Sequence, residues 1–453
     1  MDTNDFLDHL DLKRLRKRRF WYVLAFALFV LSLMAVQPLL FLAALFSLVI
    51  GFVPSWWYRH ALCYLAIRQQ VRPQRLFFGE QVVLSVTIEN QKLLPLTWLV
   101  CEEQLHPPLP ILKQQDLQRE TVGYIDNSGS IGAFQRITRH YRMQCLERGF
   151  YTFGPLTLSS SDPFGWMKCQ TTLPLYNTLL VYPLIASLED LGLTPLHLFG
   201  ERSTSRRLFE DPLRVIGARD YQLGDDLRRI HWKATARSGE LHSKVYEYSN
   251  QHRVLFLLDT GDNAKAILEI SREMLEFSIA VAASLAVYAL DKGYTVGALT
   301  NCACLTSPEL KETDHIVTQN EKRRREQFKA AKIAPAGVSV PFARDHRQYE
   351  RLLTTFSRLV PFLTISMEEV IEREDALFPA GTEVILVSAI QALTSATIER
   401  LLDLRSRRIT IQCVITGDAE RPTIAEAYNL PVYYVGGKEK WHALIQAFTV
   451  EKK

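Results

Sequence analysis

The segment VIGARDYQLGDDLRRIHWKATARSGELHSKVYEY runs from Val215 to Tyr248 and holds a dense group of charged and aromatic side chains. Two apolar stretches and a strand-rich pattern precede it, and a pattern of alternating strands and helices follows it. We therefore predict that the segment couples two folded regions. The residues that we single out in it are Arg219, Asp220, Tyr221, Gly224, Asp225, Arg228, His231, Trp232, Lys233, Arg237, Lys244 and Glu247.

The middle of this segment has the pattern of a helix followed by a strand. A carboxylate can accept the free N–H groups of a first helical turn, so we predict a helix that begins at Asp226 after the Gly224-Asp225 turn. Its apolar face would consist of Leu227, Ile230 and Ala234, and its basic face of Arg229, Lys233 and Arg237. Residues Leu241 to Tyr248 alternate as a strand does.

Three hypotheses compete for this group of side chains. The acids and histidine could bind a metal or perform acid–base chemistry; these are Asp220, Asp225, Asp226, His231 and Glu247. The cations could receive a phosphate or an acidic partner; these are Arg228, Arg229, Lys233, Arg237 and Lys244. The third hypothesis, which we favour, is that salt bridges and hydrogen bonds hold the segment to its neighbouring domain and offer a docking surface.

The motifs of the segment resemble a known family. R-D-Y-x-x-G-D-D-x-R-R-I-H-W-K-A-T-A-R starts at Arg219, and L-x-x-K-x-Y-E starts at Leu241; R-G-x-Y-x-x-G-P at Arg148 and S-D-P-F-G at Ser161 precede them. Together they resemble domain-of-unknown-function family 58, a bacterial and archaeal family, over most of the chain from about residue 70. The resemblance implies a membrane-anchored protein of the cell envelope with a von Willebrand A-like domain. It also implies a MoxR-type AAA+ ATPase and other membrane proteins as partners, but no established activity.

Residues 1–66 have the pattern of a transmembrane hairpin. Phe20–Val36 and Leu39–Trp57 carry no charge, each is close to the length that crosses a bilayer, and Gln37-Pro38 separates them. The basic flanks are Lys13, Arg14, Arg16, Lys17, Arg18 and Arg19 before the pair, and Arg59, Arg68, Arg72 and Arg75 after it. Cations on both flanks favour a multi-pass plasma-membrane protein with cytoplasmic soluble domains. A single bent span is the alternative, and a signal peptide is disfavoured because no small-residue cleavage site follows.

Residues 67–190 have the short alternating runs of a β-sandwich-like domain. The predicted strands are Gln81–Asn90, Leu96–Val100, Ile137–Cys145, Thr152–Leu158 and Thr178–Tyr182, with turns at Arg148–Phe150 and Asp162–Gly165. No catalytic motif occurs in this region, so we interpret it as an interaction or spacer module. Residues 191–250 form the signature segment or linker.

Residues 251–453 alternate strands and helices, which predicts a doubly wound, von Willebrand A-like α/β domain. The predicted strands are Val254–Asp259, Thr295–Thr300, Glu383–Ser388, Ile409–Ile415 and Val432–Val435. The predicted helices are Lys265–Leu290, Arg347–Leu359, Ser395–Arg405 and Lys438–Phe448. The charged run Glu321–Lys332 is interpreted as a solvated helix or loop.

Asp259 ends the first of these strands, where the family resemblance implies the start of a D-x-S-x-S metal-binding motif. Magnesium requires hard oxygen ligands, but the chain reads Asp259-Thr260-Gly261-Asp262-Asn263, and Ser388 stands where a further Asp is implied. We therefore predict no stable cofactor or metal and expect Asp259 to cap the next helix. Asp262 and Asn263 leave weak Mg²⁺ binding as the alternative.

Composition narrows the function further. The chain has 453 residues, enough for about two or three domains, and its net charge of +4 argues against dedicated nucleic-acid binding. The 7 cysteines are scattered without C-x-x-C, which predicts neither a disulfide framework nor a zinc site. The leading hypothesis is a membrane-tethered cytoplasmic scaffold or adaptor that is not an enzyme. The alternatives are a hydrolase or metal-dependent enzyme centred on residues 219–247, and extracellular adhesion with the opposite topology.

Overall fold

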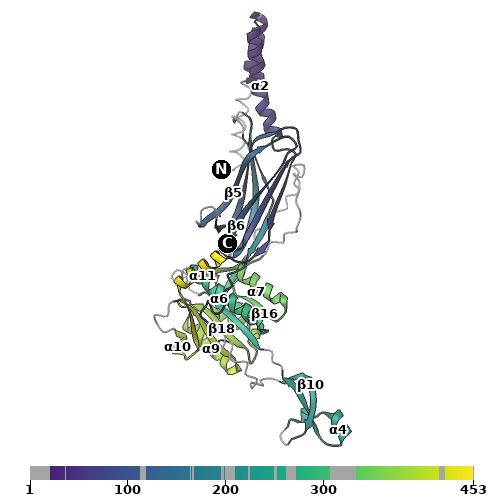
Figure 1. The fold of residues 1–453 in the computed structure, drawn as a ribbon, viewed down its shortest axis with the longest axis vertical. Helices are drawn as coiled ribbons and strands as arrows, with labels where there is room; N and C mark the ends of the chain where they lie inside the picture. The colour runs from purple at the N-terminus through teal and green to yellow at the C-terminus, as the bar shows by residue number, and fades with distance from the viewer. Residues whose placement is uncertain are drawn as a thin grey trace. The chain divides into compact units, whose positions relative to one another are not determined.

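The computed structural model describes residues 21–35, 37–112, 119–163, 165, 168–194, 198, 210–222, 225–248, 252–261, 272–306, 333–417 and 424–451. The chain divides into two compact units (Figure 1). The first comprises the described residues up to Leu180 except Phe77–Gly79, and the second comprises Phe77–Gly79 and the described residues from Val181 onward. The charged run Glu321–Lys332 lies outside the described residues.

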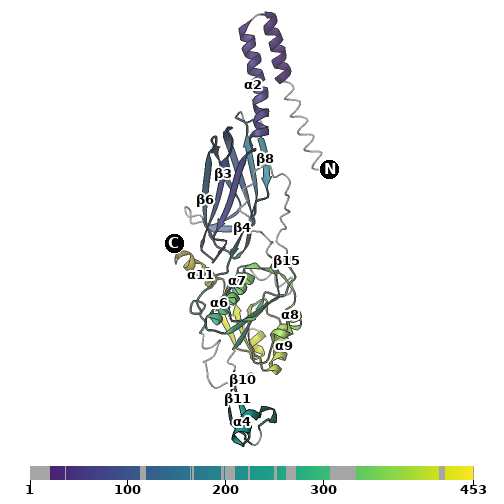
Figure 2. The same ribbon diagram turned by 90° about the vertical axis from the view of Figure 1, so that its right-hand side faces the viewer.

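The first unit begins with two apolar helices that lie side by side, Trp21–Ala35 and α2, Pro38–His60 (Figure 2). The Tyr22 hydroxyl donates a hydrogen bond to the Gly51 carbonyl at 3.4 Å, and the Ser47 hydroxyl donates to the Trp21 carbonyl at 3.3 Å. Gln37 is extended and Pro38 starts α2, because proline lacks an N–H but fits the first helical turn. The predicted helical hairpin is therefore present.

Membrane crossing by this hairpin is not confirmed by length and hydropathy. Among the described residues, the helix that is long and apolar enough to cross a membrane is α6, Arg272–Asp291, and 78% of its apolar stretch is buried. That burial is typical of a core helix in a soluble domain. The N-terminal helices count as shorter apolar stretches, Trp21–Ala35 and Pro38–Pro54.

A nine-stranded sheet forms the rest of the first unit, which we call the β domain (Figure 2). Its strands are β1 Leu65–Arg72, β2 Arg75–Leu76, β3 Gln81–Asn90, β4 Leu96–Leu112, β5 Arg119–Ile131, β6 Arg136–Cys145, β7 Gly149–Ser161, β8 Lys168–Leu173 and β9 Asn177–Val181. The order is β1-β3-β6-β4-β7-β9-β2, with β5 paired to β4 and β8 to β7. Strand β3 alternates buried and less buried residues, as one buried sheet face requires.

The predicted strands of this region are confirmed. Several of their predicted bounds were wrong, and four further strands were missed. Strand β4 continues to Leu112 although Pro107, Pro108 and Pro110 argue against a strand by sequence. The predicted turn at Arg148–Phe150 is wrong from Gly149 onward, because Gly149 and Phe150 already belong to β7. The turn that begins at Asp162 is confirmed by the hydrogen bond from the Gly165 N–H to the Asp162 carbonyl, 3.0 Å. The missed strands are β1, β2, β5 and β8.

The second unit contains a six-stranded sheet whose neighbours are β16-β13-β12-β18-β19-β20. The bounds are β12 Arg253–Asp259, β13 Thr295–Thr300, β16 Val338–Ala343, β18 Glu383–Ala389, β19 Thr410–Thr416 and β20 Val432–Gly436. All pairings are parallel except the one between β13 and β16. Counted in chain order the sheet reads 3-2-1-4-5-6, the order of a doubly wound fold.

Helices and a small second sheet complete this unit. The helices are α6, α7 His346–Arg358, α8 Met367–Arg373, α9 Ser395–Leu404, α10 Ile424–Ala427 and α11 Lys438–Glu451. The small sheet joins β14 Cys302–Leu305, β15 Ile333–Ala334 and β17 Leu359–Thr364, none of which was predicted. Of the predicted helix Lys265–Leu290, residues 265–271 lie outside the described residues.

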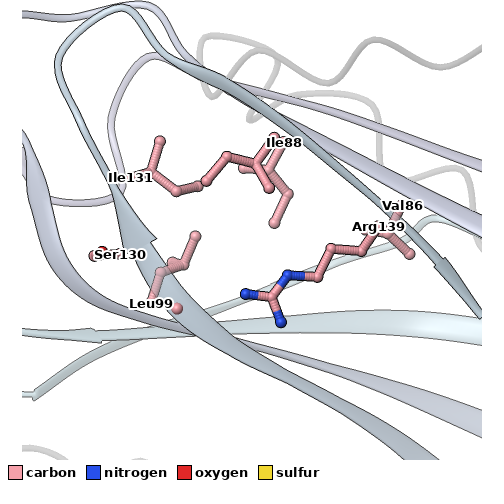
Figure 3. Close-up of a pocket in the computed structure, with 8 residues that line it drawn as sticks. Val86, Ile88, Leu99, Ser130, Ile131 and Arg139 are labelled. Carbon is pink, nitrogen blue, oxygen red and sulfur yellow. The ribbon is translucent and has the colours of Figure 1, made fainter.

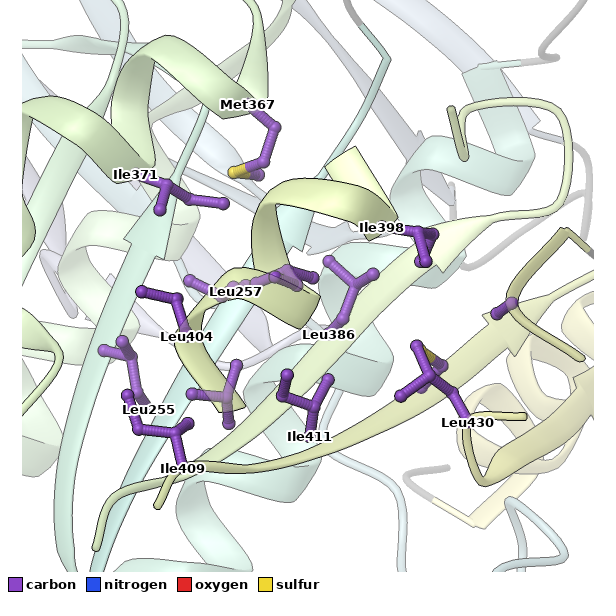
Figure 4. Close-up of a cluster of buried hydrophobic side chains, with 14 of the residues drawn as sticks. Leu255, Leu257, Met367, Ile371, Leu386, Ile398, Leu404, Ile409, Ile411 and Leu430 are labelled. Atoms are coloured by element: carbon purple, nitrogen blue, oxygen red, sulfur yellow. The ribbon is translucent and has the colours of Figure 1, made fainter. Parts of the chain in front are cut away.

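Apolar side chains hold the six-stranded sheet to its helices (Figure 4). Leu257 on β12 and Leu386 on β18 are fully buried, and Ile398 from α9 joins the same cluster. Strands β12 and β18 have helices over both faces, so nearly every residue in them is apolar and buried. This explains why continuous apolar runs predicted these strands within a residue or two.

One acid is buried in the β domain. Glu103 on β4 is 2% exposed and accepts a hydrogen bond from the Gln69 side chain of β1. Burial in apolar surroundings disfavours the carboxylate and raises the pKa of Glu103 from 4.5 to about 8. Gln69 also explains why β1 was missed, since a polar residue interrupts the alternation of Leu65, Ile67 and Val71.

We expect Glu103→Gln to flatten the pH dependence of stability. Between pH 4.5 and about 8 the folded state binds more protons at Glu103 than the unfolded state, so the free energy of unfolding falls as pH rises. One pKa unit corresponds to about 1.4 kcal/mol, so the loss amounts to a few kcal/mol. Calorimetric melting of the purified protein at pH 5 to 8 measures it. Glu102→Gln, exposed on the same strand, is the control, and equal pH slopes in both variants would contradict the prediction.

Candidate functional site

The central segment that carries the sequence motifs folds into a small unit, which we call the signature module. It consists of β10 Glu210–Asp220, the 3₁₀ turn η1 Leu227–Arg229, α4 Trp232–Ser238 and β11 His242–Tyr248 (Figure 1). Strands β10 and β11 pair antiparallel, with Asp220 opposite His242 and Ala218 opposite Lys244. Strand β11 was predicted within one residue, whereas β10 was missed.

The predicted helix start at Asp226 is wrong. The Asp226 carboxylate accepts the Arg228 N–H at 3.0 Å and caps only the η1 turn. The chain then extends at Ile230, which is 4% exposed and bridges Ser243 of β11. Burial of Ile230 against the strand therefore breaks the expected helix, and α4 begins six residues late, at Trp232. The His231 Nδ1 accepts the Ala234 N–H at 3.0 Å and caps that helix.

The acids of the module are engaged in local contacts. Arg219 Nη2 lies 2.5 Å from Asp225 Oδ1, and the Gln222 N–H donates to Asp225 Oδ2 at 3.1 Å. These contacts, the hydrogen bond from Arg219 first, lower the pKa of Asp225. Asp220 lies 3.2 Å from the His242 ring, on the facing strand. Nδ1 of His231 is used as a helix cap. The His242 ring, which meets Asp220 through Nδ1, also lies 2.7 Å from the Ser238 hydroxyl through Nε2, so Ser238, His242 and Asp220 form a hydrogen-bonded row.

The cations and two apolar side chains point outward instead. Trp232 and Leu227 are each 68% exposed. Lys233 and Arg237 lie one turn apart on α4 and are exposed, as is Arg228 in η1. The surface of α4 therefore combines two cations with an indole ring.

The other predicted residues of the module fall into two groups. Tyr221 is half-buried and donates its hydroxyl to the Asp225 carbonyl at 3.2 Å, and Lys244 is half-buried on β11. Gly224 and the side chain of Glu247 lie outside the described residues. Whether the module also packs against both neighbouring domains, as the sequence suggested, stays a prediction.

A second polar cluster lies at the carboxyl ends of β12 and β13. Asn301, which follows β13, donates from Nδ2 to Asp259 Oδ1 at 3.1 Å and to the Gly261 carbonyl at 3.2 Å. Its Oδ1 accepts both the N–H and the hydroxyl of Thr260, each at 3.2 Å. Asp259 Oδ1 also accepts the Gly261 N–H at 2.9 Å. All of these side chains are buried. Sequence reasoning missed Asn301, although a polar residue directly after a buried parallel strand is a usable signal.

The neighbouring strand ends carry hydroxyl groups. Ser388 on β18 stands directly opposite Asp259 in the strand register, as expected from the sequence. Thr416 on β19 donates to the Ser388 carbonyl at 3.4 Å and lies 2.6 Å from the Ser278 hydroxyl of α6. Hydrogen bonds thus join the carboxyl ends of four elements across the point where ligands bind in many doubly wound folds.

One oxygen of Asp259 is occupied by hydrogen bonds from the protein itself. Asp259 Oδ1 faces two N–H donors, from Asn301 and Gly261, whose hydrogens occupy the directions that a cation would need. No group of three or more His, Cys, Asp or Glu suited to a metal occurs among the described residues. Asp262 and Asn263 lie outside them. The amide of Asn301 is the hydrogen-bond partner that Asp259, Thr260 and Gly261 share.

A hollow in the β domain is a less promising site. Its volume is about 20 Å³, far below that of a ligand pocket, and it lies between β3, β4, β5 and β6 (Figure 3). Its lining consists of Val86, Ile88, Leu99, Gly129, Ser130, Ile131, Ile137 and Arg139. Arg139 is the one charged group in this lining, so the hollow lacks the converging polar groups that would orient a ligand.

Comparison with known proteins supports the resemblance for part of the chain. Residues 217–333 match the family described as protein of unknown function DUF58. The signature module is DUF58-like. The uncharacterized protein YeaD of Bacillus subtilis (strain 168) is 23% identical over 277 residues, which cover 58% of this chain and 67% of YeaD. The motif-based prediction of the family is therefore supported, without an activity attached to it.

Similarity to solved structures is slight. The CARDB domain of the PF1109 protein from Pyrococcus furiosus is 10% identical, with 26% of this chain and 91% of that chain covered and a TM-score of 0.18. The alkylpurine DNA glycosylase AlkC of Pseudomonas fluorescens is 15% identical, with 34% and 42% covered and a TM-score of 0.18. Neither likeness carries an argument about this protein.

We expect Asn301→Asp to make the strand-end cluster dependent on cations. A second carboxylate within hydrogen-bond distance of Asp259 Oδ1 would replace an N–H donor by a like charge, so the melting temperature should fall at pH 7.5. A loss of about 1–3 kcal/mol is typical for such a buried polar defect. Added Mg²⁺ or Mn²⁺ should restore part of it. Calorimetry with and without the cation measures both effects.

Asn301→Ala is the matched control, because it removes the same hydrogen bonds without adding charge. It should also melt earlier but should not respond to the cation. Stabilisation of the wild-type protein by millimolar Mg²⁺ would contradict the assignment of a closed, hydrogen-bonded cluster.

Proposed function

We propose that the protein is a membrane-tethered scaffold or adaptor that binds a protein partner through its signature module. The observation that carries this proposal is the division of charge within the module. Three of its acids, Asp220, Asp225 and Asp226, pair with His242 or Arg219 or cap a turn. Lys233, Arg237 and the ring of Trp232 are exposed together on α4. Exposed tryptophan beside arginine is the composition typical of interface hot spots.

Charge complementarity indicates the chemistry of the partner. A surface of lysine and arginine around an indole fits an acidic segment that also offers an apolar pocket. The family resemblance implies a MoxR-type AAA+ ATPase as that partner, and we adopt it as the first candidate. The enzyme alternative has one observation in its favour, the row of Asp220, His242 and the Ser238 hydroxyl on the exposed side of the module.

The apolar hairpin supports the tether. Its described side chains that are exposed are largely apolar, including Phe26 at 70%, Met34 at 82% and Leu39 at 76%. Trp56 and Arg59 stand at the end of α2, where aromatic and basic residues favour the membrane surface. We therefore propose a multi-pass protein of the plasma membrane whose soluble domains face the cytoplasm.

The α/β domain fits the same proposal as a binding scaffold of the von Willebrand A-like type. Its 3-2-1-4-5-6 strand order and the position of Asp259 at the end of the first strand support that assignment. Because the strand-end cluster is closed by Asn301, binding in this proposal depends on the protein surface and not on a metal.

We expect Trp232→Ala and Lys233→Glu/Arg237→Glu to abolish capture of the partner. A tryptophan anchor is worth about 2 kcal/mol or more, so each variant should recover at least about tenfold less partner. The measurement is affinity purification of the tagged full-length protein from detergent extracts, with quantitative mass spectrometry of what co-purifies. The ATPase should be among the proteins lost.

Matched controls are Arg347→Glu, an exposed cation on α7, and Tyr124→Ala, an aromatic residue that is 68% exposed on β5. Both should behave as wild type, and all variants should melt at the wild-type temperature. Equal recovery of the same proteins by wild type and the module variants would overturn the proposed docking surface.

A further inference from the structure

Three loops of the first unit meet where α2 ends. They follow α2 at residues 61–64, join β3 to β4 at residues 91–95, and join β5 to β6 at residues 132–135; we call them the basal loops. Lys92 Nζ donates to the carbonyls of His60 and Cys63, each at 2.7 Å, and also to the carbonyl of Ala61. These carbonyls lie at the negative end of the helix dipole, which an ammonium group stabilises.

Hydrogen bonds also tie the three loops to one another. The Gln91 N–H donates to the Tyr64 carbonyl at 3.0 Å, and the Phe134 N–H donates to the Lys92 carbonyl at 3.2 Å. Asn90 is fully buried, and its side-chain amide donates to the carbonyls of Gly132 at 2.8 Å and Leu94 at 2.9 Å. The loops therefore form one surface that is fixed to the end of α2.

Each basal loop exposes one large apolar side chain. Tyr64 is 57% exposed, Leu93 76% and Phe134 67%. Tyr64 and Phe134 also have positive φ, 54° and 51°, a conformation that residues other than glycine rarely adopt. The hydrogen bonds between the loops hold these two backbone conformations. The exposed apolar side chains are not buried inside the β domain, and an apolar phase outside it would cover them.

The surroundings identify that phase. Helix α2 has 23 residues and rises about 34 Å, which exceeds the roughly 30 Å hydrocarbon core, so its last turn falls in the headgroup layer when it spans a bilayer. Arg59 and His60 are exposed in that turn, and Arg136 on β6 neighbours the third loop with Glu89 as its ion-pair partner at 2.7 Å. Cations around apolar tips are suited to the surface of an anionic membrane.

We propose that the basal loops insert Tyr64, Leu93 and Phe134 into the headgroup layer of the membrane that holds the helical hairpin. This inference rests on the proposed membrane tether and adds a second contact to it. Three side chains of the β domain then contact the bilayer. The hydrogen bonds of Lys92 hold the β domain to the end of α2.

Photo-crosslinking to lipid tests the inference on the full-length chain. Photoreactive p-benzoylphenylalanine replaces Phe134 or Leu93, and the protein is reconstituted into vesicles of phosphatidylcholine and phosphatidylglycerol that contain a clickable lipid. Position 46 on α2, where Phe46 is 68% exposed, reports the tether itself. Position 124, where Tyr124 is 68% exposed, is the matched control. Tyr124 lies on β5 about 23 Å before Ile131, where the strand ends and the third basal loop begins, at about 3.3 Å per residue.

Lipid adducts at positions 46, 134 and 93, at least about tenfold above position 124, are the expected result. Adducts at position 46 without adducts at 134 and 93 would overturn the basal-loop contact while leaving the tether intact. No adduct at position 46 would overturn the tether and with it this inference. Crosslinks from position 134 to protein instead of lipid would assign the loops to a protein interface and also overturn it.

Discussion

The ion pair between Arg219 and Asp225 is the interaction on which the signature module depends. It joins the end of β10 to the turn before η1, and the Gln222 N–H completes the binding of the same carboxylate. With that turn fixed, Asp226 caps η1, Ile230 reaches β11, and His231 caps α4. Asp220, Asp225, Asp226 and His231 each have a structural partner in the module. Lys233, Arg237 and Trp232 are exposed on α4. The division of charge that supports a docking role is thus a consequence of how the turn is closed.

A similar closure occurs at the strand ends of the α/β domain. A doubly wound sheet leaves backbone donors and acceptors at the carboxyl ends of its central strands, and in many such folds a ligand satisfies them. In this protein the amide of Asn301 does so, because it supplies donors to Asp259 and Gly261 and an acceptor to Thr260. An amide is neutral, so Asn301 joins these groups without adding a charge to the cluster. The position that looks most like a metal site by topology therefore contributes to stability.

The sequence predicted best where one physical pattern governed a segment. Continuous apolar runs predicted β12 and β18 because helices cover both faces of those strands, and alternation predicted β3 because one face is buried. Prediction failed where a distant contact overrode the local pattern. The bridge between Ile230 and Ser243 moved the helix start to Trp232, and the buried partner Gln69 interrupted the alternation of β1. Asn301 was missed although its place directly after a buried parallel strand is a local signal; its partners Asp259 and Thr260 at the end of the neighbouring strand were not evident from that signal.

Buried polar clusters and exposed aromatic side chains differ in what they indicate about function in this protein. Clusters of Asp, His and Asn attract attention in a sequence, yet in the described structure such residues bind one another, as Asp259 and Asn301 do. The side chains that do not contribute to packing are of another type. They are exposed rings such as Trp232 and Phe134, each adjacent to cations. Water solvates a lysine or arginine at little cost, whereas an exposed indole or phenyl ring gains free energy when a partner or a membrane covers it. Exposed aromatic side chains beside cations are accordingly better indicators of function in this protein than its buried polar clusters.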